Sequence, residues 1–201
     1  MAKSLSKGAI ALIVILVLLV GCGGFTMSKY NGLVQQDEAV STAWSDIQAQ
    51  YQRRSDLIPN LVNTVKGYAS HESETLEGVV AARAKATQVT VDADDLTPEK
   101  IAKVQAAQGE LSAALGKLLA ITENYPDLKA NQNFSELQAQ LEGTENRINE
   151  SRLKYNGIVQ SYNTEVRSFP TNIIAGMFGF EKKTKFEANE KAQEAPTVSF
   201  D

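Results

Sequence analysis

The sequence predicts an all-α fold, in which an N-terminal membrane helix is followed by a bundle of long antiparallel helices. An uncharged apolar stretch opens the chain, apolar residues then return at three- and four-residue intervals, and strand signals are almost absent. Such intervals indicate helices that each bury one stripe. The predicted organisation is an anchor over residues 1–28, a helical bundle over 29–170, and an apolar glycine-containing segment with an extended tail over 171–201.

The anchor begins with a short basic region and continues without charge. Lys3 and Lys7 precede the apolar run Ala9–Val20, which has the length of a signal-peptide core. The longer uncharged stretch Gly8–Ser28 would extend about 32 Å as a helix, enough to cross a hydrocarbon layer of roughly 30 Å. An uncleaved transmembrane helix is therefore favoured, and a cleaved secretory signal is an alternative.

Cys22 is the only cysteine of the chain and lies inside this stretch. Leu19-Val20-Gly21-Cys22 resembles the lipobox of bacterial lipoproteins, in which processing leaves a lipidated cysteine as the new N-terminus. Cys22 is therefore a candidate lipidation site, and a lipoprotein signal is the second form of the anchor. Either form places the following domain at a membrane surface.

Charge asymmetry around the anchor predicts its orientation. The N-terminal amine, Lys3 and Lys7 precede the apolar stretch, whereas Lys29 is soon followed by Asp37 and Glu38. The positive-inside rule then places the N-terminus in the cytoplasm and the helical domain outside, in the periplasm.

Three helical segments are expected after the anchor. The first runs from about Tyr30 to Thr87, with a kink or break near Leu57–Pro59, because proline removes a helical hydrogen bond. The second begins at Thr97-Pro98, an N-cap followed by proline at the first helical position, and stops at Asn124–Asp127. The third continues through Phe134 to Phe169 and ends at Pro170.

The stretch Thr171–Phe180 is too apolar for a solvated tail. Its apolar residues form a candidate contact segment, for which packing or self-association is favoured over direct membrane contact: Ile173, Ile174, Met177, Phe178 and Phe180. Glu181–Asp201 is mixed in charge and contains Pro196, so an extended or partly disordered tail is expected.

Composition argues against several classes of function. The part of the chain after Met27 holds all 24 acidic residues but only 18 of the 20 basic ones, which disfavours binding to nucleic acid through a basic field. A single cysteine excludes an intramolecular disulfide framework and any zinc site built from several cysteines. With one histidine, His71, material for a metal or nucleophilic site is scarce, so we expect no metal, no cofactor and no enzymatic activity.

Charged residues in or beside the buried stripes predict a polar layer that fixes helix register. Helical spacing places Arg54 and Glu72 there, and because unpaired buried charges are costly, partners such as Glu145, Arg152 or Glu165 are expected from the third helix. A catalytic carboxylate pair is the less favoured interpretation.

Two further features have simpler explanations. His71 beside Glu72 has the chemistry of a pH switch, but a single exposed helix histidine is commoner. Trp44, Tyr51 and Tyr68 resemble an aromatic binding patch, yet their helical spacing favours a place in the core.

The motifs of the chain resemble those of the bacterial LemA family. They are Tyr30-Asn31-Gly32-Leu33-Val34, Ala43-Trp44, Gln52–Val62, Lys66-Gly67-Tyr68-Ala69, His71-Glu72, Ala82-Arg83, Tyr155-Asn156, Phe169-Pro170, Phe178-Gly179-Phe180 and Ala195-Pro196-Thr197-Val198-Ser199-Phe200. The resemblance covers nearly all of the chain after the anchor. It implies a membrane-anchored helical bundle and brings no catalytic residues. Because members usually carry a plain membrane helix, the Leu19–Cys22 lipobox is a departure.

The sequence therefore favours a non-enzymatic, membrane-anchored scaffold of the bacterial envelope that self-associates or engages other envelope proteins. The alternative is a sensor or regulator whose bundle responds to a ligand, or to pH through His71 and Glu72.

Overall fold

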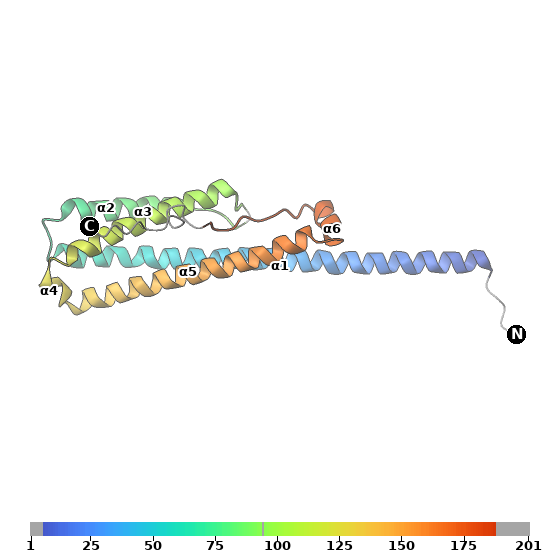
Figure 1. Cartoon of the computed structure of the whole chain (residues 1–201), viewed down its shortest axis with the longest axis horizontal. Coiled ribbons are helices and arrows are strands. Elements are labelled where there is room, and N and C mark those ends of the chain that lie inside the picture. Colours follow the sequence, from blue (N-terminus) through green and yellow to red (C-terminus); the bar gives the residue numbers. More distant parts are fainter. Residues whose placement is uncertain (1–5, 94, 188–201) are drawn as a thin grey trace, which may run out of the picture.

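The computed structural model describes residues 6–93 and 95–187, and every regular element within them is a helix. The long helices α1 and α5 run side by side in opposite directions, and α2 and α3 pack beside them (Figure 1). The all-α prediction is therefore confirmed. The helices are α1 (Lys7–Lys66), α2 (Ser73–Gln88), α3 (Pro98–Thr122), α4 (Pro126–Lys129), α5 (Gln132–Arg167) and α6 (Thr171–Phe178).

Helix α1 joins the apolar N-terminal stretch to the bundle without interruption. It has 60 residues and is about 90 Å long at the usual helical rise. Ser6 caps its start, because the hydroxyl oxygen accepts a hydrogen bond from the Ala9 N–H. The N-terminal part projects beyond the bundle (Figure 1), and the apolar side chains of this part are exposed. By length and composition, this part of α1 can cross a membrane.

Of the two alternatives expected near Leu57–Pro59, a kink or a break, the break is wrong, because α1 passes through Pro59 and continues to Lys66. A proline at this position leaves the carbonyl of Ser55, four residues earlier, without its helical N–H partner. Arg83 of α2 supplies the missing donor, since its Nε–H donates to the Ser55 carbonyl oxygen at 2.8 Å. Ser55 is buried, so this carbonyl has little access to water as a substitute.

The chain reverses instead at residues 67–72, and α2 then ends at Gln88, close to the expected end of the first helical segment. Tyr68 was expected in the core but lies in this turn and is 44% exposed, so that part of the prediction is wrong. Its hydroxyl oxygen accepts a hydrogen bond from the Asn131 side chain at 2.9 Å. Trp44 and Tyr51 are buried as expected.

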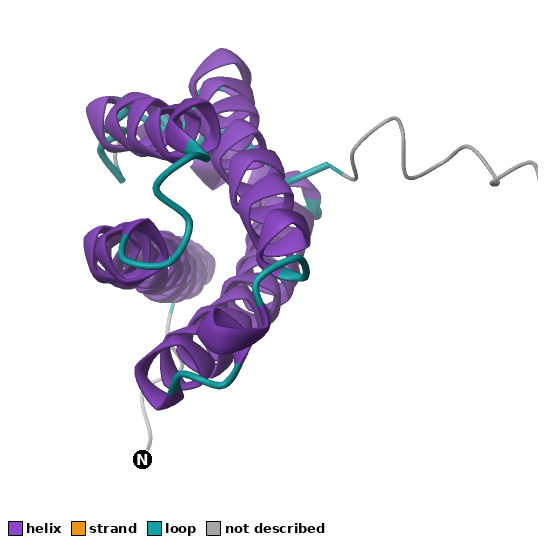
Figure 2. Cartoon of the chain, turned by 90° about the vertical axis from the view of Figure 1, so that its left-hand side faces the viewer, coloured by secondary structure: helices purple, strands orange, loops and turns teal. Residues whose placement is uncertain are grey.

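Capping residues determine where α3 and α5 begin. The hydroxyl oxygen of Thr97 accepts from the Lys100 N–H at 3.3 Å, and Pro98 occupies the first turn of α3. The side-chain oxygen of Asn131 accepts from the Phe134 N–H at 3.0 Å at the start of α5. Figure 2 views the bundle from the end opposite the projecting part of α1 and shows its helices joined by loops.

Two apolar clusters fill the bundle. The cluster nearer the projecting part of α1, called here the proximal core, joins α1, the start of α3, α5 and α6 with loop residues Val91 and Leu96 and with Phe186. The cluster at the opposite end, called here the distal core, joins α1, α2, α3, α4 and α5. Its buried members include Ile58, Leu61, Val65, Leu76, Val79, Leu111, Leu118, Leu128, Phe134 and Leu141.

Residues 181–187, the start of the expected tail, lie extended along the bundle after α6. Phe186 is only 7% exposed, so this part of the chain belongs to the folded domain. The extended or partly disordered tail expected over Glu181–Asp201 stays a prediction, and residues 188–201 lie outside the described part of the chain.

Candidate functional site

A buried arginine lies at the boundary between the two cores. Arg54 is 2% exposed, and its Nη1 donates to Glu145 Oε2 at 2.6 Å and to Ser112 Oγ at 2.9 Å. Its Nη2 donates to the side-chain oxygen of Gln108. One guanidinium therefore contacts both α3 and α5, and we call these four residues the Arg54 cluster.

The geometry of the Arg54 cluster suits a register device. Glu145 is 41% exposed, so water still solvates the carboxylate while the guanidinium is buried. A shift of α3 or α5 along α1 would leave this cation without partners, at a cost of several kcal/mol. The cluster also lines a groove of about 440 Å³ between α3 and α5, which includes Leu115, Leu119 and Leu141.

Two residues expected in the polar layer lie elsewhere. Arg152 donates from Nε and Nη2 to the Tyr51 hydroxyl oxygen, at 3.1 and 2.9 Å, within the proximal half of the bundle. Burial raises the pKa of Tyr51, while the neighbouring Arg152 opposes that shift. Glu72 lies at the distal end, where its carboxylate accepts a hydrogen bond from the Tyr125 hydroxyl at 2.9 Å and raises the pKa of that tyrosine. The structure thus brings Arg54 and Glu145 into contact. Glu72 and Arg152 do not take part in this contact.

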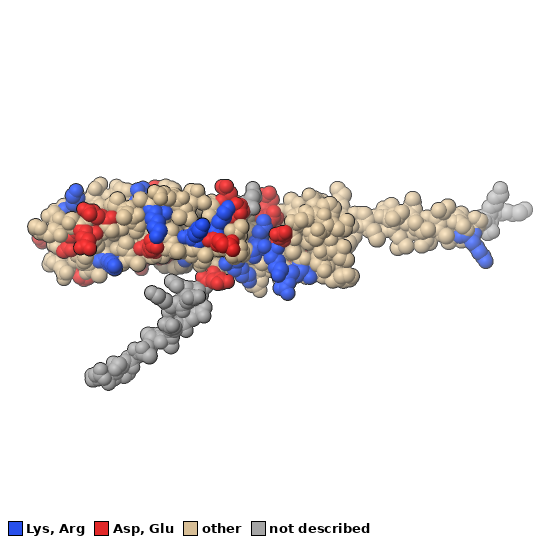
Figure 3. Space-filling view, turned by 90° about the horizontal axis from the view of Figure 1, so that it is seen from above, with Lys and Arg blue, Asp and Glu red and all other residues tan. Residues whose placement is uncertain are grey.

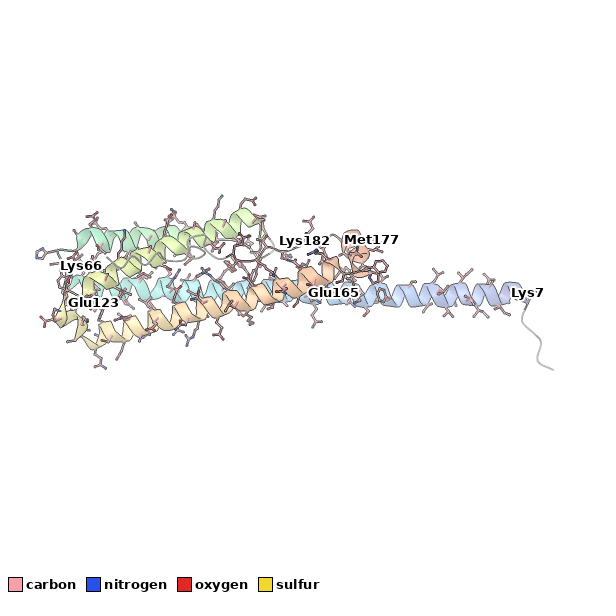
Figure 4. The ribbon with its side chains drawn as sticks, in the orientation of Figure 1. Lys7, Lys66, Glu123, Glu165, Met177 and Lys182 are labelled. Atoms are coloured by element: carbon pink, nitrogen blue, oxygen red, sulfur yellow. The ribbon has the colours of Figure 1, made fainter. Side chains whose placement is uncertain are left out.

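Glu165, the remaining expected partner, lies at the proximal end. Its Oε1 is 2.8 Å from Lys29 Nζ and also accepts a hydrogen bond from the Thr171 hydroxyl at 3.2 Å. The hydrogen bond from Lys29 lowers the pKa of the Glu165 carboxyl. Figure 4 shows Glu165, Met177 and Lys182 near the end of the bundle from which α1 projects.

The candidate contact segment forms α6 and the residues after it. Ile174 is buried against the proximal core and Phe180 packs at its edge, whereas Ile173, Met177 and Phe178 are exposed. Gly179 ends the helix with φ of 79°, which lets the Phe180 N–H bond back to the Ala175 carbonyl at 3.0 Å. One part of the contact segment thus packs against the core, and the other part lies on the surface.

The sequence reasoning missed how the chain after α6 is held. Asn163 and Asn156 each use both polar atoms of their side-chain amide to bond the backbone N–H and carbonyl of Lys183 and Phe186, at 2.8–2.9 Å. The Phe186 ring stacks on Trp44 with centroids 5.7 Å apart. We call residues 181–187 the C-terminal strap. The seven-residue spacing of the two asparagines on α5 was the available signal.

Cys22 lies exposed in the projecting part of α1. Among residues 6–93 and 95–187, no group of three or more histidine, cysteine, aspartate or glutamate side chains is arranged to hold a metal ion. Lipidation of Cys22 stays a prediction.

These features define a class of protein: an all-α bundle whose central helix continues into an apolar N-terminal stretch. The sequence model of the LemA family matches residues 43–200, and the chain belongs to that family. It is 26% identical to Protein LemA of Metamycoplasma hominis, covering 89% of this chain and 78% of that protein. It is 27% identical to Magnetosome protein MamQ 2 of Paramagnetospirillum magneticum, covering 98% of this chain and 79% of the relative. Membership and these relatives indicate a membrane-associated, LemA-like protein.

Proposed function

We propose that this protein is a non-enzymatic scaffold, anchored in the bacterial cell membrane by α1, whose bundle projects from the membrane surface. The observation that carries the proposal is the continuity of α1. Its first part is apolar and exposed, and its second part supplies Trp44, Ile47, Ile58 and Leu61 to both cores. Because no hinge separates the two parts, the orientation of the anchor determines the orientation of the bundle.

The form of the anchor is part of the proposal. We favour an uncleaved transmembrane helix, because the projecting part of α1 has the length and hydropathy to span the bilayer. In the alternative lipoprotein form, cleavage before Cys22 would leave a shorter helix, and acyl chains would hold it in the membrane. Following the positive-inside rule, the bundle is assigned to the periplasmic side.

A scaffold also accounts for the side chains of the bundle. The Arg54 cluster would fix the register of α3 and α5 on α1, which keeps the outer surface in one arrangement. Family membership brings no catalytic residues with it, and the two charged side chains of the Arg54 cluster, Arg54 and Glu145, are paired with each other. Binding to copies of itself or to other envelope proteins is therefore the proposed activity.

Size-exclusion chromatography with light scattering on the detergent-extracted, full-length protein tests the assembly part of the proposal. The expected result is a mass that exceeds one chain plus detergent, or specific partners in crosslinking pull-downs from the envelope. A strict monomer that captures nothing would remove the scaffold proposal.

The sensor alternative is tested through His71. This residue is exposed, and its neighbour Glu72 bonds to Tyr125. Thermal melts of the wild type and of His71→Ala between pH 5 and pH 8 should therefore superimpose. A difference that appears only below neutral pH would support the pH-responsive version of the alternative.

A further inference from the structure

Helix α6 lies beside α1 at the point where the apolar stretch of α1 ends. The Phe178 ring packs edge-on against Tyr30 with centroids 4.8 Å apart, and the Phe180 ring lies 5.7 Å from Tyr30. Tyr30 follows Ser28, the last residue of the uncharged stretch, by two positions. At the helical rise this separation is about 3 Å, so α6 is at the level where α1 would leave the hydrocarbon layer.

A polar contact fixes α6 at this level. Lys29 is the first charged residue after the apolar stretch, and its ammonium group pairs with Glu165 near the end of α5. The same Glu165 oxygen accepts the hydroxyl hydrogen of Thr171, the first residue of α6. The start of α6 is thereby tied to the charged residue that marks the edge of the anchor.

The outer face of α6 is apolar and uncovered. Thr171, Ile174 and Ala175 are buried against the bundle, whereas Ile173 is 54% and Met177 73% exposed. Phe178 and the preceding Phe169 are also more than half exposed. In Figure 3 the end of the bundle around the base of the projecting helix carries no charged side chain on the visible face, and both basic and acidic side chains border this area.

We propose that α6 is an interfacial helix, and that its exposed apolar side chains enter the headgroup and acyl boundary of the bilayer that α1 spans. The headgroup region on each side is about 5 to 7 Å thick, which matches a helix a few ångströms beyond the hydrocarbon edge. Interfacial helices commonly carry basic side chains beside their apolar face, and Lys182 lies exposed beside α6. The occupant of this face is therefore lipid, and a second copy of the chain is the competing occupant.

Contact of α6 with the membrane, in addition to the spanning part of α1, would define the orientation of the bundle relative to the membrane. A single spanning helix can rotate and tilt, because packing and interfacial anchors set both angles. With α6 held in the interface on one side of α1, one face of the bundle is turned toward the membrane. The inference rests on the proposed function, since it requires α1 to be in the bilayer.

Fluorescence quenching in vesicles tests the inference. The full-length protein carrying Cys22→Ser and Met177→Cys is labelled with an environment-sensitive fluorophore and reconstituted into phosphatidylcholine and phosphatidylglycerol vesicles. The matched control carries the label at Leu153→Cys, which is 74% exposed on α5. Its neighbour Tyr155 packs near Trp44, which is about 21 Å further along α1 than Tyr30.

The expected result is blue-shifted emission at position 177 and loss of fluorescence when the lipids carry a headgroup nitroxide, with neither change at position 153. Vesicles that float with the protein but give no quenching at position 177 would overturn the interfacial helix and leave the anchor intact. Shielding that grows with the protein-to-lipid ratio, without lipid quenching, would assign the face to a second copy. Failure of the protein to float with vesicles would overturn the anchor itself, and the inference with it.

Discussion

The two ends of the bundle are built from different kinds of contact. The distal core joins helices that follow one another along the chain, from the end of α1 through α2, α3 and α4 to the start of α5. The proximal core joins α1 to the loop before α3, the start of α3, α5, α6 and the C-terminal strap, and the last three of these are far from α1 in the sequence. Trp44 and Phe186 are stacked there although most of the chain separates them.

This difference assigns separate roles to the two halves. The distal half can form from consecutive segments, so its integrity depends on local apolar periodicity. The proximal half closes only when the C-terminal strap returns to α1, and this half also carries the surface nearest the anchor. Substitutions that change one half and leave the other unchanged would support these separate roles, and equal effects in both halves would contradict them.

The largest expected effect is removal of the central side chain of the proximal core. Trp44 is 1% exposed, and its Nε1 donates to the Val91 carbonyl at 3.0 Å. Trp44→Ala should lower the free energy of unfolding by about 4 kcal/mol and release Phe186. Leu61→Ala in the distal core should cost about 3 kcal/mol and leave Phe186 in place. Urea unfolding measures the free energy of unfolding, and hydrogen exchange of residues 183–187 measures whether Phe186 is released.

Leu153→Ala is the matched control, because this side chain is exposed, and a change within about 0.5 kcal/mol is expected. Equal acceleration of exchange in the strap for Trp44→Ala and Leu61→Ala would contradict the division into two halves.

The boundary between the halves should respond asymmetrically to substitution of its ion pair. Glu145→Ala leaves the buried Arg54 cation without a countercharge and should cost about 3 kcal/mol. Arg54→Met removes the cation and leaves Glu145, which water reaches, so the expected loss is about 1 kcal/mol. Urea unfolding compares the two, with the exposed Glu142→Ala as control. The opposite order of losses would mean that the guanidinium stabilises the bundle chiefly through its hydrogen bonds to Ser112 and Gln108, which do not require Glu145.

The uninterrupted course of α1 through the distal half depends on Arg83. Arg83→Ala removes the donor from the Ser55 carbonyl and should cost about 2 kcal/mol. In a Pro59→Ala background the alanine N–H can bond to that carbonyl, so Arg83→Ala should cost clearly less. Chemical unfolding of the wild type, the two single variants and the double variant gives the coupling energy between Arg83 and Pro59. Additive losses would show that Arg83 acts independently of the proline.

The smallest expected effect concerns the strap. Asn163→Ala removes two hydrogen bonds to Lys183 and should lower the free energy of local opening by about 1 to 2 kcal/mol. Hydrogen exchange should accelerate at the Lys183 amide and not in the distal core. Asn149→Ala, an exposed asparagine on the same helix, provides the control. Unchanged exchange at Lys183 would show that the other strap contacts, such as the Phe186 ring and the Asn156 hydrogen bonds, hold the strap without Asn163.

The long helices were accessible to sequence reasoning because periodicity and capping residues specify them. Thr97 and Pro98 mark the start of α3, and the apolar stripe of the third segment reproduces α5. The passage of α1 through Pro59 was not accessible, because the compensating donor, Arg83, comes from another helix. Proline rules describe a helix on its own, whereas tertiary partners can satisfy the carbonyl that proline leaves free.

In the candidate sites too, some features follow from the sequence and others depend on contacts between distant segments. The pairing of Arg54 with Glu145 follows from the cost of burying a charge, and the structure brings these two residues together. Glu72 could not be placed correctly, because its position depends on where the chain reverses after α1. The C-terminal strap escaped prediction because a short extended segment with one buried side chain has no periodicity to detect.

The most direct test of the anchor is the intact mass of the protein extracted from membranes. If α1 is an uncleaved helix that spans the bilayer and continues into both cores, the membrane fraction contains a chain with its original N-terminal region and no acyl addition. A product that begins at Cys22 and carries added acyl mass would contradict the spanning helix and establish a lipid anchor in its place.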